Sequence, residues 1–173
     1  MIQTVAQIIG VFAVGLYLLS YQLKKRIHIV GVTCVSNVLY VSQYLLLGAF
    51  SGAVMDILST VSSFLAAKKN AKCFEKYAKW IAATNIIVII IAGIIITVVR
   101  GDWLEVLPIG GAVFPTLGLW CDNEQTIRKF GLIGAPFWLV YNFIAKAYGA
   151  ALGSALSIIS LVLALIRYRK KQF

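Results

Sequence analysis

WIAATNIIVIIIAGIIITVV, residues 80–99, is the stretch that decides the class of fold. It carries no charged side chain, and Arg100 follows it directly. A helix needs about 20 mainly apolar residues to cross the hydrocarbon core of a bilayer. Backbone N–H and C=O groups in hydrocarbon must be satisfied within their own segment, so the stretch is predicted to be a transmembrane helix.

The rest of the chain has the same character. It has 173 residues, of which 61% are hydrophobic and 13% are charged. That is about half the charged share of a soluble domain. Apolar stretches of spanning length nearly fill the chain and leave no room for a soluble catalytic domain. An all-α integral membrane protein is predicted, with seven transmembrane helices at about 5–22, 28–46, 49–67, 80–99, 103–120, 129–145 and 147–166.

The basic residues predict how these helices are oriented. With seven spans, fourteen of the sixteen Lys and Arg residues fall on one side of the membrane, and only Arg100 and Lys146 fall on the other. Short cytoplasmic loops carry such an excess of positive charge. Without the span at 103–120 the division would be nine to seven. The pattern predicts an outside amino terminus and a cytoplasmic carboxyl terminus. It also accounts for the net charge of +10 without nucleic acid, for which no continuous basic face is present.

Two segments resemble each other at a spacing of 98 residues. AFSGAVMDILSTVSSFLA (49–66) and AYGAALGSALSIISLVLA (147–164) share seven identical residues in 18 positions. The same shift pairs Tyr40 with Trp138, Gln43 with Tyr141 and Tyr44 with Asn142. Such self-similarity predicts an internal repeat.

The repeat predicts a 3+1+3 arrangement of two parallel three-helix bundles. Residues 1–67 would form the first bundle, 68–100 a cytoplasmic loop and linker helix, and 101–173 the second bundle with its basic tail. Parallel repeats related by an axis along the membrane normal hold substrate near the midplane. The alternative is that the repeat is a relic of folding without a central cavity.

Ionisable groups within spans are costly and usually functional. Asp56 lies about seven residues into the third span, where it is predicted to face a cavity and bind a cation, a proton or a substrate hydroxyl. The alternative is an acid paired with Arg100 or Lys146 near the outer rim. Glu105 is expected at the outer interface, as a structural cap or as a gate.

Aromatic and amide side chains mark one face of each of two spans. Residues 37, 40 and 44 recur at i, i+3 and i+7 on the second span, and residues 138, 141 and 142 lie on the matching part of the sixth. Flat aromatic walls with amide groups suit a sugar ring, a nucleoside or a vitamin. Anchoring at a membrane interface is the alternative for Tyr and Trp. The predicted substrate-binding residues are Asn37, Tyr40, Gln43, Tyr44, Asp56, Trp138, Tyr141 and Asn142.

The stretches WLEVLPIGGAVFPTLGLWC (103–121) and FWLVYNFIAKAYGA (137–150) resemble the YgjV family of small bacterial inner membrane proteins. That family is itself distantly similar to the superfamily of SWEET, PQ-loop and PnuC facilitators, which move sugars, amino acids or vitamins. The resemblance implies a transporter fold in the bacterial inner membrane and supports Trp138 and Asn142 as residues near the substrate. The Pro-Gln pair of PQ-loop relatives is absent from the first and fifth spans.

The leading hypothesis is a facilitator that carries a small polar, ring-bearing solute by alternating access around a midplane site. The rival is a non-transporting scaffold that binds lipid or a partner protein on the same fold. An enzyme is not expected, because the single histidine and the absence of a nucleophile–base pair leave no catalytic constellation. No metal or cofactor is expected either. The expected partners are a small solute and the lipid bilayer, and association into a homo-oligomer stays open.

Overall fold

All of the regular structure in the computed structural model, which describes residues 2–145 and 147–169, is helical. The prediction of an all-helical chain is therefore confirmed. The elements are α1 (Ile2–Gln22), α2 (Arg26–Leu47), α3 (Phe50–Ala67), α4 (Lys72–Glu75), α5 (Ala78–Arg100), the 3-10 turn η1 (Trp103–Val106), α6 (Leu107–Trp120), α7 (Glu124–Ile144) and α8 (Tyr148–Arg169).

Six of the described helical segments are long and apolar enough to cross a membrane. They are α1, α2, α3, α5, the segment Trp103–Trp120 and α8. The remaining long helix, α7, has 21 residues, but its first turns carry Glu124, Arg128 and Lys129. It begins five residues before the predicted boundary at 129 because Asn123 caps it, with Oδ1 accepting from the N–H groups of Gln125 and Thr126. Arg128, predicted to lie in a loop, is therefore a helical residue.

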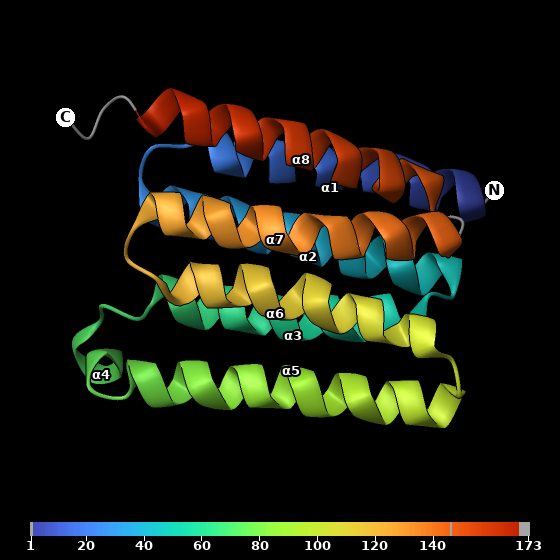
Figure 1. The fold of residues 1–173 in the computed structure, drawn as a ribbon, viewed down its shortest axis with the longest axis horizontal. Helices are drawn as coiled ribbons and strands as arrows, with labels where there is room; N and C mark the ends of the chain where they lie inside the picture. Colours follow the sequence, from blue (N-terminus) through green and yellow to red (C-terminus); the bar gives the residue numbers. More distant parts are fainter. Residues whose placement is uncertain (1, 146, 170–173) are drawn as a thin grey trace.

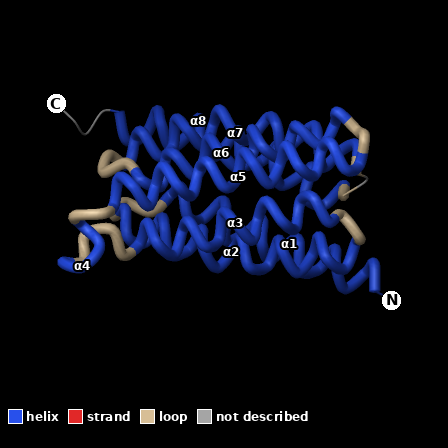
Figure 2. The backbone as a smooth tube through the Cα atoms, turned by 90° about the horizontal axis from the view of Figure 1, so that it is seen from below, coloured by secondary structure: helices blue, strands red, loops and turns tan. Residues whose placement is uncertain are grey.

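The long helices are arranged in two layers (Figures 1 and 2). In one layer α2 packs between α1 and α3, and in the other α7 packs between α6 and α8. The layers meet where α1 contacts α8 and where α3 contacts α6. Helix α5 packs against α3 and α6 at one edge. Most of its side chains are exposed, since only Ile89 and Gly93 are buried, as expected of a helix that faces lipid.

The connecting segments gather at two opposite ends of the molecule. The loops that follow α1, α3 and α6 lie at one end together with α4 and the end of α8 (Figure 1). This end carries Lys24, Lys25, Lys68 and Lys69 and is called the lysine-rich end below. The amino terminus and the turns after α2, α5 and α7 lie at the other end, called the N-terminal end. Lys146 and residues 170–173 lie outside the described residues.

Two glycines end helices at the N-terminal end. Gly48 closes α2 with φ of 72°, and Gly101 closes α5 with φ of 64°. This left-handed conformation costs little only for residues without a Cβ, so both positions favour glycine.

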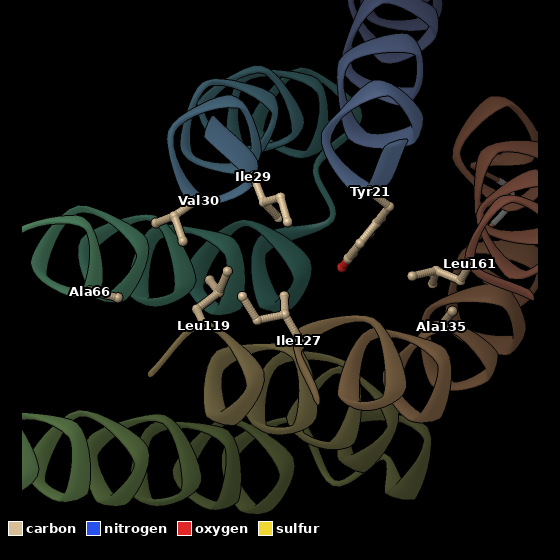
Figure 3. Packing of buried hydrophobic residues seen from close by; sticks show 8 residues of the cluster. All are labelled: Tyr21, Ile29, Val30, Ala66, Leu119, Ile127, Ala135 and Leu161. Atoms are coloured by element: carbon tan, nitrogen blue, oxygen red, sulfur yellow. The ribbon is translucent and has the colours of Figure 1, made fainter. Parts of the chain in front are cut away.

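An apolar cluster fills the interior toward the lysine-rich end (Figure 3). It joins both layers, because Ile29 and Val30 of α2 lie in the same cluster as Leu119 of α6 and Ile127 of α7. Tyr21, Ala66, Ala135 and Leu161 complete it. Tyr21, Leu119 and Ala135 of this cluster also line a cavity between the layers, so the cluster adjoins the centre of the protein on its lysine-rich side.

Candidate functional site

A cavity of about 50 Å³ lies between the two layers, and it is called the central cavity below. Its lining comes from α1, α2 and α3 in one layer and from α6, α7 and α8 in the other. Six of the eight predicted binding residues line it, namely Asn37, Tyr40, Tyr44, Asp56, Trp138 and Asn142. The structure therefore brings together residues that are spread over more than a hundred positions of the sequence.

The other two predicted residues lie outside the central cavity. Gln43 is fully buried and packs against Gly10 of α1, and neither its Nε2 nor its Oε1 has a hydrogen-bond partner among the described residues. It points toward Gly10 of α1 because its position on α2 is turned away from residues 37 and 44, although it is the i+3 neighbour of Tyr40. The Tyr141 hydroxyl instead contacts the Ser51 hydroxyl at 2.7 Å and accepts from the Gly52 N–H at 3.2 Å.

Aromatic rings form a continuous row through the cavity. The Tyr44 ring lies between Tyr40 and Trp138, with centroid distances of 6.2 and 6.0 Å and interplanar angles of 22° and 17°. Tyr17 packs edge-on against Tyr40 on one side, and Tyr141 packs edge-on against Trp138 on the other. Since the three central rings already stack on one another, no solute ring fits between them in this conformation.

Several polar groups of the row are satisfied within the protein. The Tyr44 hydroxyl donates to Asn142 Oδ1 at 2.7 Å, and Asn142 Nδ2 donates to the Ser154 hydroxyl at 3.2 Å. Trp138 Nε1 donates to the Gly111 carbonyl at 2.7 Å. These bonds cross from α2 to α7, from α7 to α8 and from α7 to α6, so they hold the walls of the cavity in place.

The Asp56 carboxylate stands apart from this network. Asp56 is only 7% exposed and lines the central cavity, yet no hydrogen bond or ion pair to its carboxylate occurs among the described residues. The alternative partner Arg100 is engaged by Glu105, with Nε and Oε1 3.0 Å apart. The other alternative, Lys146, is outside the described residues. Asn37 and Tyr40 likewise have side chains that make no hydrogen bond within the described part of the chain.

A second pocket, of about 290 Å³, opens at the N-terminal end. The turn after α2, the Arg100–Glu105 pair and Tyr141 line it. Tyr141 packs against Tyr44, with ring centroids 6.5 Å apart, and Tyr44 lines the central cavity. These two tyrosines therefore form a thin partition between the second pocket and the central cavity.

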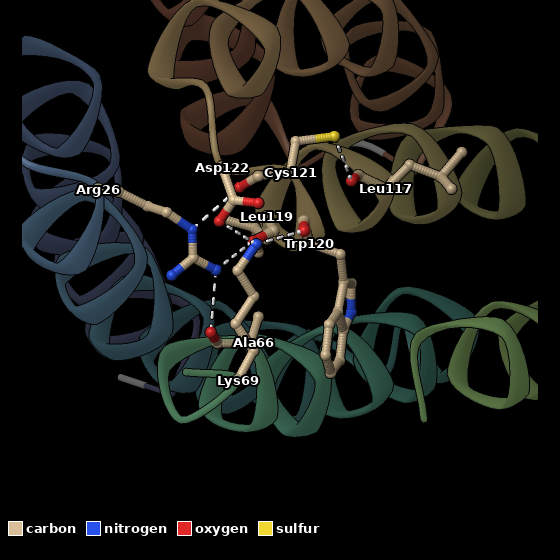
Figure 4. A network of polar contacts seen from close by, with 8 residues as sticks. All are labelled: Arg26, Ala66, Lys69, Leu117, Leu119, Trp120, Cys121 and Asp122. Carbon is tan, nitrogen blue, oxygen red and sulfur yellow. Dashed lines mark hydrogen bonds and ion pairs between the residues drawn. The ribbon is translucent and has the colours of Figure 1, made fainter. Parts of the chain in front are cut away.

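A polar network closes the lysine-rich end between α2, α3 and α6 (Figure 4). Arg26 Nε donates to the Cys121 carbonyl, and its Nη2 donates to the carbonyls of Leu119 and Ala66, at 2.7–2.9 Å. Lys69 Nζ donates to the Trp120 carbonyl and pairs with Asp122 Oδ1 at 2.6 Å. The hydrogen bond from Lys69 lowers the pKa of the exposed Asp122 carboxyl. Together, Arg26 and Lys69 satisfy the last carbonyls of α6, which the helix itself leaves unpaired.

Arg128 donates hydrogen bonds to backbone carbonyls at the end of α1. It is 2% exposed, and it donates to the carbonyls of Tyr21 at 3.1 Å and Leu23 at 2.9 Å. Its guanidinium lies 4.5 Å from the centre of the Tyr168 ring, and the Tyr168 hydroxyl donates to the Gln22 carbonyl at 2.8 Å. The carbonyls bound at the end of α1 and just beyond it belong to residues 21–23, and those bound at the end of α6 and just beyond it belong to residues 119–121, which is a spacing of 98.

The sequence missed several residues that line the central cavity. Tyr17, Thr33 and Ser59 face it together with the predicted set. Tyr17 could have been found from its spacing of four residues to Tyr21, which puts two tyrosines on one face of an apolar helix. Thr33 continues the face of α2 that carries residues 37, 40 and 44, one turn earlier.

The comparison with known proteins identifies the family. A family model described as Imp-YgjV, bacterial inner membrane protein, matches residues 4–172. No curated protein and no solved structure matches the chain. The match extends over nearly the whole chain and agrees with the apolar helices of spanning length. The chain belongs to the Imp-YgjV family of bacterial inner membrane proteins.

Proposed function

We propose that this protein is a facilitator that carries a small polar, ring-bearing solute, such as a sugar, a nucleoside or a vitamin, across the inner membrane. The observation that carries the proposal is the central cavity, which is lined from both layers and contains the unpartnered Asp56 carboxylate. A buried polar cavity costs stability, because its groups are removed from water without full compensation, and this cost favours a binding role for the cavity.

The two layers would move as the halves of a 3+1+3 transporter. Pairs of bonds at the spacing of 98 residues support this division. Trp120 of α6 donates to Ser62 of α3, and Gln22 of α1 donates to Ser160 of α8, both at 2.9 Å. Residues 22 and 120 are 98 positions apart, and so are residues 62 and 160. The two hydrogen bonds therefore join equivalent positions of the two proposed halves, in opposite directions. A distant relationship to the SWEET, PQ-loop and PnuC facilitators would follow.

The size of the cavity defines the state of the transporter. Sites for ring-bearing ligands measure about 300–1,000 Å³, whereas the central cavity measures about 50 Å³. The conformation is therefore closed around its site, and the layers must separate before a solute ring can bind. We infer that the solute passes between Tyr44 and Tyr141 to reach the second pocket, because the two rings pack together and each lines one of the two cavities. The apolar cluster and the arginine contacts block the other direction.

The orientation follows from the charges. The lysine-rich end would face the cytoplasm, since positive charge is retained there, and the N-terminal end with its second pocket would face outward. In this orientation, the structure would be an occluded state in which Tyr44 and Tyr141 separate the central cavity from the outward-facing second pocket.

Binding and uptake together test this function. The purified protein is screened for a rise in its melting temperature with sugars, nucleosides and vitamins, because a ligand that binds only the folded state stabilises it by about 2.7 kcal/mol at 100 times its Kd. Ligands that stabilise are then tested for uptake into proteoliposomes. We expect Tyr40→Ala and Trp138→Ala to abolish both effects, while Glu75→Gln, an exposed acid on α4, leaves them intact. If a ligand binds but is never taken up, the non-transporting scaffold becomes the better reading.

A further inference from the structure

The Asp56 carboxylate has no counter-ion among the described residues. A carboxylate that is 7% exposed and belongs to a membrane-spanning helix is expensive to keep charged without a partner. No Lys, Arg or His is among the described residues that line the cavity, and three basic side chains of the chain are engaged elsewhere. Arg100 pairs with Glu105, Lys69 pairs with Asp122, and Arg128 donates to backbone carbonyls. Within the described residues, the protein itself supplies no counter-ion for the central cavity.

The rest of the lining suits a compact positive charge. Tyr17 and Tyr40 line the same cavity as Asp56, and aromatic rings attract cations. Thr33 lines the same cavity, and its buried hydroxyl makes no hydrogen bond within the described residues. Its oxygen is therefore available as a ligand. A water molecule needs roughly 10–15 Å³ of such space, so about 50 Å³ holds a small charged group with a few waters but not a whole solute ring.

From these contacts we infer that the central cavity binds a positively charged group, with Asp56 as its counter-ion and Tyr17 and Tyr40 beside it. This inference rests on the proposed function and deepens it. The bound group would belong to the transported solute or would be an ion that moves with the solute. The shared chemistry is a monovalent cation. Its source is either an alkali-metal ion or the ammonium group of an organic solute. Tyr17 and Tyr40 beside Asp56 favour ammonium, because aromatic rings attract organic cations.

Thermal-shift titrations at constant ionic strength distinguish the sources. The probes are sodium, potassium, methylammonium and tetramethylammonium chlorides, with methanol as a neutral probe. We expect a saturable rise in the melting temperature with at least one cation and none with methanol. Asp56→Asn should raise the half-saturating concentration at least tenfold. Asp56→Ser serves as a second variant, because Ser154 stands at the equivalent position of the proposed repeat. Glu75→Gln removes an equal charge from an exposed site and should change nothing.

The outcomes separate the two sources and the two proposals. Stabilisation by methylammonium that weakens in Tyr40→Leu identifies an organic ammonium group, whereas stabilisation by sodium or potassium that Tyr40→Leu preserves identifies an alkali ion. A wild-type protein that no cation stabilises, or one whose response survives in both Asp56 variants, overturns the cation site. Uptake of a neutral solute that persists in Asp56→Asn would overturn the cation site while leaving the facilitator intact. Cation binding without uptake of any solute would overturn the facilitator while leaving the cation site intact.

Discussion

The Tyr44 hydroxyl donates a 2.7 Å hydrogen bond to Asn142, its counterpart at the spacing of 98 residues. Two positions that correspond in the proposed halves can touch each other only if both lie beside the axis that relates the halves. The bond therefore lies beside the axis of the proposed repeat, where it joins α2 to α7. It is also buried, since both residues are 2% exposed.

Removing this hydroxyl should loosen the contact between the layers. Tyr44→Phe leaves Asn142 Oδ1 without its donor, and an unpaired buried acceptor costs about 1–3 kcal/mol. The free energy of unfolding in mixed micelles measures the loss. A double-mutant cycle with Asn142→Ala should give a coupling of about 0.5–2 kcal/mol. Tyr77→Phe, at a tyrosine that is 54% exposed, is the matched control and should be neutral.

Gly111 should tolerate no side chain. An added Cβ would lie 2.8 Å from the Trp138 ring, whose Nε1 also donates to the Gly111 carbonyl. Gly111→Ala should therefore displace Trp138 and destabilise the protein by about 1–3 kcal/mol. Gly15 lies in α1 with nothing within 4 Å of such a Cβ, so Gly15→Ala should be neutral or slightly stabilising. Equal effects at the two glycines in thermal unfolding would contradict this packing.

Arg128 should matter far more than its neighbour Lys129. Arg128→Met leaves the carbonyls of Tyr21 and Leu23 without a donor, and hydrogen bonds from charged groups contribute about 1.5–3 kcal/mol each. Lys129→Met removes the same charge from an exposed position and should stay within about 0.5 kcal/mol of wild type. Chemical unfolding of the two variants side by side provides the test. A comparable loss in both would mean that total charge, and not the contact with α1, is what counts.

The Lys69–Asp122 pair should give a small, acid-sensitive contribution to stability. The pKa of Asp122 is lowered in the folded state, so the pair stabilises fully above the ordinary Asp pKa of about 3.9 and loses its effect as the pH falls through the folded pKa. Because Asp122 is 84% exposed, we expect at most about 1 kcal/mol. The difference in melting temperature between wild type and Asp122→Asn should be steady from about pH 7 to pH 5 and shrink below about pH 4. A difference that grew in acid would argue against the pair.

The orientation can be measured with single cysteines. In a variant without Cys34, Cys73 and Cys121, an impermeant reagent applied to intact cells should label a cysteine at position 102 but not one at position 25. Position 102 follows α5 and position 25 follows α1, and the turns after these two helices lie at opposite ends of the molecule (Figure 1). Labelling of both from outside would contradict the proposed orientation.

The helices were predictable from sequence because apolar length and charge placement act locally. The predicted end of the first span at residue 22 and of the third at 67 coincide with the ends of α1 and α3. The start of α7 was missed because its first turns are polar. The sequence signal for this start is Asn123, a residue type that favours the N-cap position of a helix. The short helix α4 was not expected in the basic loop either.

The candidate site was predictable only where one helix face could be read. Residues 37, 40 and 44 share a face of α2, and all three line the central cavity. Gln43 was inferred through its spacing to Tyr141, and spacing does not say which neighbour a side chain meets. The role of Arg128 depends on carbonyls more than a hundred residues away, which no local pattern reveals.

The contacts of Arg128 and Tyr168 also impose an order on biosynthesis. The carbonyls at the end of α1 receive their hydrogen bonds from residues that follow 105 to 146 positions later. At about 5–20 residues per second, the ribosome takes about 5–30 s to supply those donors. Until then, the carbonyls at the end of α1 need hydrogen bonds from water or lipid headgroups. Helix α1 therefore reaches its final environment only when the last helix has been made.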